Sequence, residues 1–243
     1  MPLRRIAFSF VACTALVVSA CSDKSSAPTA APAQPPAAAA ANARAAKDLE
    51  MYRQLMQSKS YELAGPIGQE IVAKYPDSPA AKEVRETLAD TVAKSTAITA
   101  RRRLERLWIY QSGKESGGDQ TTASIYSSQP ATVDRVRLVL RRHSAWGQSA
   151  YLFGSGKGFE CGKSCALSVR FDDEAPQRLK AHLPETGEPA IFISDDRAFL
   201  AKMMKAQKIS IDVVVKGKGA QTLMFEVGGY DAEKFTELKK KPS

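Results

Sequence analysis

Histidine is nearly absent from this chain, which has only two in 243 residues, His143 and His182. Neither lies in a motif that would make it a catalytic base, since the sequence contains no Gly-x-Ser-x-Gly and no His-Glu-x-x-His. We therefore interpret both histidines as satisfied or exposed side chains. The sequence predicts no enzyme.

A phosphate-binding loop is also missing, although Gly154-Ser-Gly-Lys-Gly and Gly162-Lys-Ser suggest one at first sight. Such a loop needs a glycine five residues before the glycine of Gly-Lys, and those positions hold Tyr151 and Lys157. The glycines favour hairpin turns instead, and no cofactor is predicted.

Two pairs of adjacent acids occur, Asp172-Asp173 and Asp195-Asp196. Catalysis by two carboxyl groups needs them to face each other across a cleft, whereas neighbours in sequence point in different directions. We expect Asp195 or Asp196 to cap the helix that follows it.

The sequence lacks an apolar run of the roughly 20 residues that a membrane-spanning helix needs. Residues 6–20 form a shorter apolar run after the positive charges of Arg4 and Arg5, which is the form of an export signal. The signal ends in Val18-Ser-Ala-Cys21, which resembles the lipobox of bacterial lipoproteins.

This resemblance implies that residues 1–20 are removed and that Cys21 carries diacylglycerol and palmitate. The chain would then be anchored to a bacterial membrane and face the periplasm. Ser22 implies the outer membrane rather than the inner one, although Asp23 weakens that assignment. The alternative is an ordinary secretory signal that happens to end near a cysteine.

Residues 21–46 are rich in Ala, Pro and Ser. A segment of this composition cannot bury enough apolar surface to offset the entropy of ordering, so we interpret it as a tether. Its alanine run from Ala37 to Ala41 favours helix, so its far end can already belong to the first helix.

Two cysteines remain for the folded part once Cys13 leaves with the signal and Cys21 is acylated. Cys161 and Cys165 lie between two strand-like runs, and in an oxidising compartment the pair predicts a structural disulfide. A redox pair or a metal site is the alternative. Redox pairs favour two intervening residues at a helix start, and a zinc site needs four ligands.

The chain is basic, with a formal charge of +9 that falls to +7 without Arg4 and Arg5. A basic envelope protein can contact anionic lipid head groups, lipopolysaccharide or an acidic protein partner, whereas export separates it from nucleic acid. The plainer interpretation is a set of solvated faces. The basic clusters are Arg101, Arg102, Arg103 and Arg106, then Arg141 with Arg142, and Lys239 to Lys241.

Residues 47–104 have apolar side chains at helical spacing, and Ser78 and Pro79 predict the start of a helix there. The stretch from Ile71 to Val84 resembles one helix-turn-helix of tetratricopeptide-type repeats in envelope assembly lipoproteins. The match covers about one repeat, and a stable solenoid needs roughly three. A plain helical hairpin and a docking surface both remain open.

Residues 105–232 change to a period of two, which indicates half-buried strands of an antiparallel sheet, and residues 233–243 form a basic tail. One helix, residues 195–207, interrupts the strands. The predicted fold is α+β: a tetratricopeptide-like helical hairpin, followed by an antiparallel β-sandwich or partly open barrel with one inserted helix.

The second half contains Trp108-Ile-Tyr, a Phe-x-Cys strand, Val169-Arg-Phe-Asp-Asp and Met224-Phe-Glu-Val-Gly-Gly-Tyr. With these motifs it resembles a family of uncharacterised proteobacterial envelope β-domains. More remotely it is similar to the periplasmic accessory protein associated with type VI secretion. These are core strands and a cysteine, so the resemblance implies fold and location but no activity.

Together these features predict an anchored, non-enzymatic envelope protein that binds or supports another envelope component of unknown identity. One alternative is an inhibitor or immunity lipoprotein against a periplasm-directed toxin, which would share the anchor, tether and small β-domain. The other is an envelope hydrolase with a site assembled from scattered residues. Fold-level resemblance alone does not separate the three.

Overall fold

A computed structural model of the chain describes residues 36–131, 135–154, 156–162 and 165–238. The chain divides into two units, Met1–Ala40 and Ala41–Ser243. The predicted signal, the acylation at Cys21, most of the tether and the lysines at 239–241 lie outside the described residues. Within the described ranges, no helix is both long and apolar enough to cross a bilayer.

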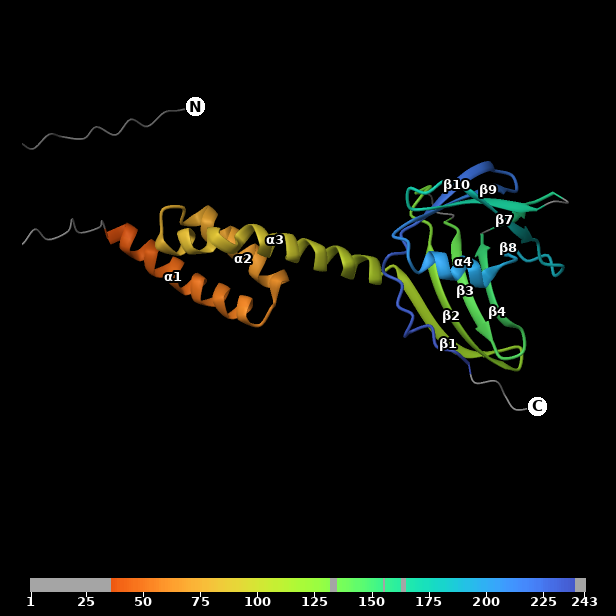
Figure 1. The fold of residues 1–243 in the computed structure, drawn as a ribbon, viewed down its shortest axis with the longest axis horizontal. Coiled ribbons are helices and arrows are strands. Elements are labelled where there is room, and N and C mark those ends of the chain that lie inside the picture. Colours follow the sequence, from red (N-terminus) through yellow and green to blue (C-terminus); the bar gives the residue numbers. More distant parts are fainter. Residues whose placement is uncertain (1–35, 132–134, 155, 163–164, 239–243) are drawn as a thin grey trace, which may run out of the picture. The chain divides into compact units, whose positions relative to one another are not determined.

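Three helices precede the sheet: α1 (Pro36–Gln57), α2 (Tyr61–Lys74) and α3 (Pro79–Glu105) (Figure 1). Helix thus begins at Pro36, before residue 47, as the alanine run allowed. Ser78 caps α3, because its Oγ accepts a hydrogen bond from the Ala81 N–H at 3.0 Å and Pro79 takes the first helical position. This confirms the predicted helix start.

All three helices contribute to one small apolar core. At the centre of this core, the Tyr52 hydroxyl of α1 lies 2.8 Å from Thr87 Oγ1 and 3.0 Å from Thr91 Oγ1 of α3. Gly68 of α2 allows close packing, since a Cβ there would lie 2.8 Å from both Leu88 and Tyr52. The arrangement therefore has three helices, and its tetratricopeptide character stays a prediction. The buried residues are Ala45, Leu49, Tyr52, Ala64, Ile71, Ala80, Ala81 and Val84.

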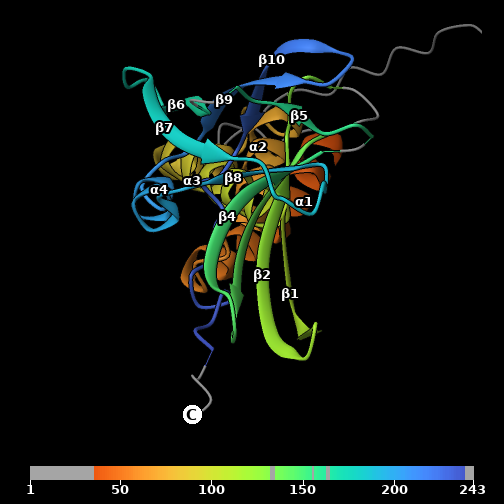
Figure 2. The same cartoon turned by 90° about the vertical axis from the view of Figure 1, so that its right-hand side faces the viewer.

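The rest of the chain forms one curled antiparallel sheet in the order β1-β2-β3-β4-β8-β7-β6-β9-β10, with β5 paired to β9 (Figure 2). Helix α4 (Asp196–Met203) connects β8 to β9 and lies against β4. The strands are β1 (Trp108–Glu115), β2 (Gly118–Tyr126), β3 (Arg137–His143), β4 (Gly147–Phe153), β5 (Phe159–Glu160), β6 (Ala166–Phe171), β7 (Gln177–His182), β8 (Ala190–Ile193), β9 (Ile209–Val215) and β10 (Gly219–Phe225).

The two outer strands of the sheet, β1 and β10, do not pair with each other. Part of the gap is bridged, because the Ser128 N–H donates to the Met224 carbonyl at 2.7 Å and the Met224 N–H to the Gln129 carbonyl at 3.2 Å. Trp108 Nε1 donates across the same gap, which we call the seam, to the Val227 carbonyl at 3.3 Å. The fold is therefore α+β with a partly open barrel, one of the two predicted forms.

Alternate residues of the strands fill the interior of this barrel, as the period of two predicted. Leu138, Leu140, Val169, Ile211 and Phe225 are among its fully buried members. The same core includes three buried residues of α4: Phe199, Leu200 and Met203. Because the core occupies one face, the remaining side chains of β2, β3, β4 and β8 lie on the opposite face of the sheet.

Candidate binding surface

The side chains on that opposite face make a cluster that we call the arginine–aromatic face: Tyr126, Arg137, Arg141, Tyr151, Phe153 and Phe192. They come from four adjacent strands, β2, β3, β4 and β8. The register aligns Tyr126 with Arg137, Arg137 with Phe153, and Tyr151 with Phe192. Each alternates with buried neighbours such as Ile125, Leu138, Leu152 and Ile191, so all six lie outside the core.

A row of stacked rings crosses this face. The centroids of Tyr151 and Phe192 lie 4.7 Å apart with an angle of 28° between the rings. His182, at the end of β7, continues the row at 5.5 Å from Phe192 and 20°. Tyr151 and Phe192 are half-buried and His182 is exposed. The flat sides of these rings therefore lie against one another, and the row presents mainly ring edges.

Arg141 lies over three of the rings around it. Its guanidinium carbon is 5.1 Å from the Trp146 centroid, 5.3 Å from that of Tyr151 and 5.9 Å from that of Phe192. Its Nε also donates to Ser149 Oγ at 3.2 Å. These contacts hold the guanidinium against the rings, and no other hydrogen bond joins it to a residue that the structure describes.

Arg137 makes a second, similar arrangement further along β3, 5.6 Å above Phe153 and 6.0 Å from Tyr126. Among the residues that the structure describes, neither Arg137 nor Arg141 has a carboxylate within ion-pair distance. Most basic side chains of the α3 cluster do have one: Arg101 pairs with Glu105, Arg102 with Glu62 and Arg103 with Glu226.

Burial raises the pKa of Tyr151, and the positive charges of Arg141 and Arg137 oppose that shift. The Tyr151 hydroxyl therefore stays neutral at physiological pH and can both donate and accept a hydrogen bond.

A hollow of about 240 Å³ adjoins the rings on the same side of the sheet. Its lining is mainly polar, and the Gln120 Oε1 in it is buried with no hydrogen-bond partner among the described residues. Buried acceptors normally have a partner, and because the protein covers this oxygen, a molecule in the hollow does not reach it. The lining residues are Gln111, Ser112, Gly113, Lys114, Gln120, Thr122, Ser124, Arg137, Val139 and Tyr151.

Of the two histidines, predicted to be satisfied or exposed, His143 has hydrogen-bonded ring nitrogens and His182 is exposed. His143 is 2% exposed; its Nδ1 accepts from the Ala145 and Trp146 N–H groups at 3.1 and 3.3 Å, and its Nε2 lies 2.9 Å from the Glu115 carbonyl. This pattern requires the proton on Nε2, so neither nitrogen is left to act as a base. The Nδ1 of His182 lies 3.4 Å from Ser194 Oγ.

Asp172 and Asp195 accept backbone hydrogen bonds, and of Asp195 and Asp196, either of which was expected to cap the helix, the cap is Asp195. Its side chain accepts from the Ala198 N–H at 3.1 Å at the start of α4. Asp172 Oδ1 accepts from the N–H groups of Gln207 and Lys208, both at 2.8 Å, and Asp173 pairs with the Lys208 ammonium at 3.0 Å.

Cys161 and Cys165 form a disulfide with their Cα atoms 5.1 Å apart. It lies at the rim of a second hollow, of about 440 Å³, over β6, β9 and β10. Arg178, Asp212 and Thr222 contribute to this hollow, and Asp212 already accepts from the Thr222 hydroxyl at 2.7 Å. Its described lining contains no aromatic ring, so it offers less for recognition than the arginine–aromatic face.

One sign of the arginine–aromatic face is visible in the sequence, because Arg137 and Arg141 alternate with core residues of one strand. Sequence reasoning assigned Arg141 to a basic cluster with Arg142, but the structure separates the two. Arg142 points to the other side of β3, where it lies 4.3 Å from the Phe235 ring centroid and donates to the Phe235 carbonyl. The aromatic partners of Arg141 come from other strands and were not predicted.

Comparison with known proteins gives little to set beside this surface. No family model matches the chain, and no curated protein matches it. Among solved structures, the chain is similar to the crystal structure of invasion associated protein B from Bartonella henselae, at 15% sequence identity and a TM-score of 0.36. That likeness covers 51% of this chain and 84% of the other.

Proposed function

We propose that the chain is a lipid-anchored protein of the bacterial envelope, held at Cys21, with a non-enzymatic binding role. The arginine–aromatic face is its binding surface. The observation that carries the binding role is the pair of half-buried arginines, Arg137 and Arg141, held over rings without a described carboxylate beside them.

The physical argument concerns desolvation. Partial burial of a guanidinium costs free energy unless its N–H groups find acceptors. Pairing within the protein would offset that cost, as the Phe235 carbonyl does for the half-buried Arg142. Arg137 and Arg141 instead keep their donors available while the rings fix their orientation. A partner that brings anionic oxygens meets donors that are already in place, so less entropy is lost on binding.

The anchor, the tether and the helices complete the proposal. The lipobox at residues 18–21 supports export and acylation, and the following segment supports a tether between membrane and helices. The tetratricopeptide-like stretch of α2 and α3 and the remote similarity to the secretion-associated accessory protein fit an assembly role in the periplasm, with the outer membrane favoured by Ser22.

The anchor is tested by labelling cells with an alkyne analogue of palmitate. We expect the wild-type chain to be labelled and found in the membrane fraction. Cys21→Ser should lose both the label and the membrane association, whereas Cys13→Ser, a cysteine of the predicted signal, should keep both. Equal labelling of the Cys21→Ser chain and the wild type would refute acylation at this residue.

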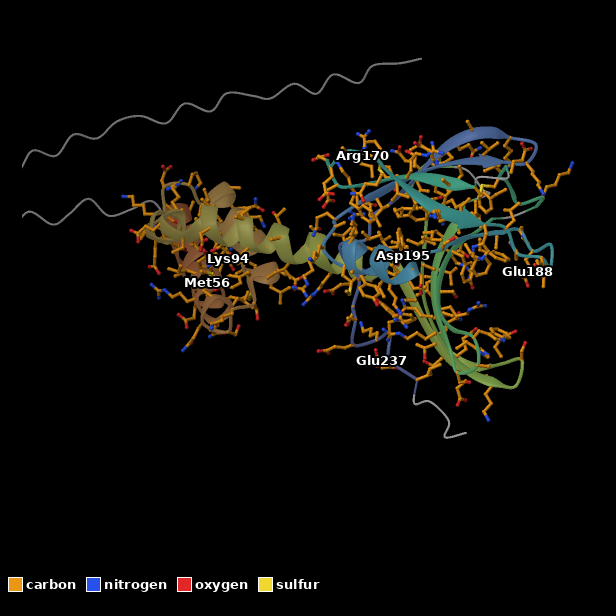
Figure 3. All side chains as sticks on the ribbon, turned by 45° about the vertical axis from the view of Figure 1, so that its right-hand side comes forward. Met56, Lys94, Arg170, Glu188, Asp195 and Glu237 are labelled. Carbon is orange, nitrogen blue, oxygen red and sulfur yellow. A yellow bond between two sulfur atoms is a disulfide. The ribbon has the colours of Figure 1, made fainter. Side chains whose placement is uncertain are left out.

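The binding surface is tested by sedimentation of the anchored chain, solubilised in non-ionic detergent, with isolated cell-wall and outer-membrane fractions. Arg137→Gln combined with Arg141→Gln should reduce the bound fraction. Arg170→Gln is the matched control, since Arg170 (labelled in Figure 3) is an exposed arginine on β6, a strand that contributes no residue to the face. If both variants bind like the wild type, the face is not the binding surface.

A further inference from the structure

We propose that the arginine–aromatic face docks another protein of the envelope, and that this partner inserts an acidic side chain into the hollow beside Arg137 and Tyr151. This inference rests on the proposed binding function and names the chemical class of the partner. Three features of the face support it: exposed apolar side chains at both of its ends, a charge of one sign, and a hollow of the size of a side chain.

Large apolar side chains stay exposed at both ends of the face. The register aligns Tyr126 with Arg137 at the start of β3, and Ile109 of β1 lies on the same side of the sheet. Tyr126 is 41% exposed and Ile109 40%. Trp146 is 52% exposed in the turn after β3, where it contacts Arg141. Tryptophan, tyrosine and arginine are enriched where proteins bind one another and among the residues that contribute most to binding, so this composition favours a protein partner.

The charge of the face is of one sign. The outward positions of β2, β3, β4 and β8 hold Arg137 and Arg141 but no acidic residue, and Lys114 adds a cation at the hollow. Among the described residues, none of these three cations has a carboxylate within ion-pair distance. Like charges that face each other across an interface repel, so a matching partner brings carboxylates. A symmetric dimer through this face would instead set arginines against arginines.

The hollow beside the rings gives a place to one of these carboxylates. It measures about 240 Å³, whereas sites for whole small molecules usually measure about 300–1,000 Å³, so it suits the end of a side chain. Arg137, Lys114, Thr122 and Tyr151 are among its lining residues, and its described lining contains no acid. A guanidinium, an ammonium and hydroxyls all donate hydrogen bonds that a carboxylate accepts. The hollow therefore favours an aspartate or glutamate of the partner.

Other partners fit the face less well. Single-stranded nucleic acid needs free ring faces on which its bases stack, but the flat sides of Tyr151 and Phe192 lie against each other. A peptide that binds by strand addition needs an unpaired sheet edge, and β3 and β4 are paired on both sides. An anionic lipid surface would match the positive charge and the exposed Trp146, and the experiment therefore includes an anionic lipid.

The test is sedimentation of the anchored chain, in non-ionic detergent, with envelope fractions in three forms. One is untreated, one is digested with a protease that is then inactivated, and one has its carboxylates amidated with carbodiimide and ethanolamine. We expect the wild type to bind the untreated fraction about tenfold more tightly than either treated form, and binding should weaken as salt is raised. Phosphatidylglycerol, added as a competitor in mixed detergent micelles, should leave the bound fraction unchanged.

Variants of the two arginines test the charge of the face. Arg137→Gln and Arg141→Gln should each weaken binding to the untreated fraction about tenfold, whereas Arg170→Gln should leave it unchanged. Arg141→Lys keeps the charge but loses the planar guanidinium, so it should recover only part of the affinity.

A second set of variants tests the hollow. Thr122→Phe places a ring in it and should weaken binding about tenfold. Thr222→Phe, the same change at an exposed position of β10, should have no effect. Circular dichroism and thermal unfolding of each variant show whether the barrel is intact. If the Thr122→Phe chain unfolds, Lys114→Gln takes its place, because it removes a cation of the hollow at an exposed position.

Full binding to the protease-treated or the amidated fraction would overturn the inference, and so would displacement by phosphatidylglycerol. Unchanged binding of a folded Thr122→Phe chain would overturn insertion into the hollow. If binding survives the protease but still requires Arg137 and Arg141, the partner is not a protein and the proposed binding function stands. If the double arginine variant binds the untreated fraction like the wild type, both fail.

Discussion

The replacement of Gly229 by alanine tests how the end of α3 is joined to the barrel. Gly229 is buried in the turn after β10, and a Cβ there would lie 2.2 Å from the Leu104 carbonyl carbon and 2.3 Å from the Glu105 nitrogen. Both atoms are backbone atoms of α3, so no side-chain rotation removes the overlap. The helix end and the turn have to move apart.

That movement disturbs neighbouring contacts. Trp108 Nε1 donates to the Val227 carbonyl at 3.3 Å, and Arg103 holds Glu226 by two hydrogen bonds of 2.6 and 3.1 Å. Overpacking of this kind costs about 1–3 kcal/mol, and loss of a partly exposed ion pair adds up to about 1 kcal/mol. We therefore expect Gly229→Ala to lower the free energy of unfolding by about 3 kcal/mol.

Gly228→Ala is the matched control, one residue earlier in the same turn. Its added Cβ would lie 2.3 Å from the Gln207 Oε1, the end of an exposed and flexible side chain that can turn away. We expect a cost below about 1 kcal/mol. Both substitutions reduce the chain entropy of the unfolded state similarly, so that effect cancels in the comparison.

The assay is urea unfolding of both variants, followed by circular dichroism and by tryptophan fluorescence. Trp108, 5% exposed, lies at the seam and reports its integrity, whereas Trp146 is 52% exposed. Equal shifts of the urea midpoint for the two variants would refute the reasoning, because they would show that α3 does not press against Gly229.

Three further predictions concern the disulfide, a tyrosine and an ion pair. The closed loop between Cys161 and Cys165 is short, so the double serine variant should lose only about 2 kcal/mol in urea unfolding. A loss of sedimentation with the envelope fractions in this variant would contradict the assignment of the binding surface to the arginine–aromatic face. Burial raises the pKa of Tyr230 from 10.0 to about 12, so its contribution to stability is present below pH 10 and is lost as pH rises through 12. Tyr230→Phe should abolish this decrease in the free energy of unfolding at high pH, and it should also remove the last step in the titration of tyrosinate absorbance. Identical pH profiles for the variant and the wild type would count against the raised pKa of Tyr230. The hydrogen bond from Arg103 lowers the pKa of Glu226 below 4.5, so the pair stabilises above that pH and the contribution is lost as pH falls through the lowered pKa. Glu226→Gln should reduce the loss of unfolding free energy at low pH by about 0.5–1 kcal/mol, since both side chains of the pair are partly exposed. Glu70→Gln, which removes an ion pair within one helix, is the control.

The strands and helices were predictable where one local rule decided them. Ser78 before Pro79 marked the start of α3, and the alternation in Ile209, Ile211, Val213 and Val215 marked β9. Asp195 was predicted as a helix cap and is one. The helix predicted over residues 195–207 ends at Met203, because Met204 closes its last turn and the chain then re-enters the sheet at Ile209.

The form of the barrel was less predictable because it depends on contacts between distant segments. A sandwich and a partly open barrel need the same alternation within each strand. What decides between them here is the pairing of β4 with β8 and of β7 with both β6 and β8, which makes one continuous sheet. The seam adds the pairing of Gln129 with Met224, two residues 95 positions apart in sequence.

The arginine–aromatic face was also hard to predict, because it too depends on contacts between segments that are distant in sequence. Alternation determines on which face of its own strand a side chain lies, so the outward positions of Arg137, Tyr151 and Phe192 follow from the sequence. Alternation does not determine which other strand pairs with a given strand. Tyr151 meets Phe192 because β4 pairs with β8, which is remote in sequence, and a shift of that register by one residue would turn Phe192 into the core. The site is therefore a property of the sheet, and substitutions that alter the pairing of β4 and β8 should impair binding even where they leave every residue of the face unchanged.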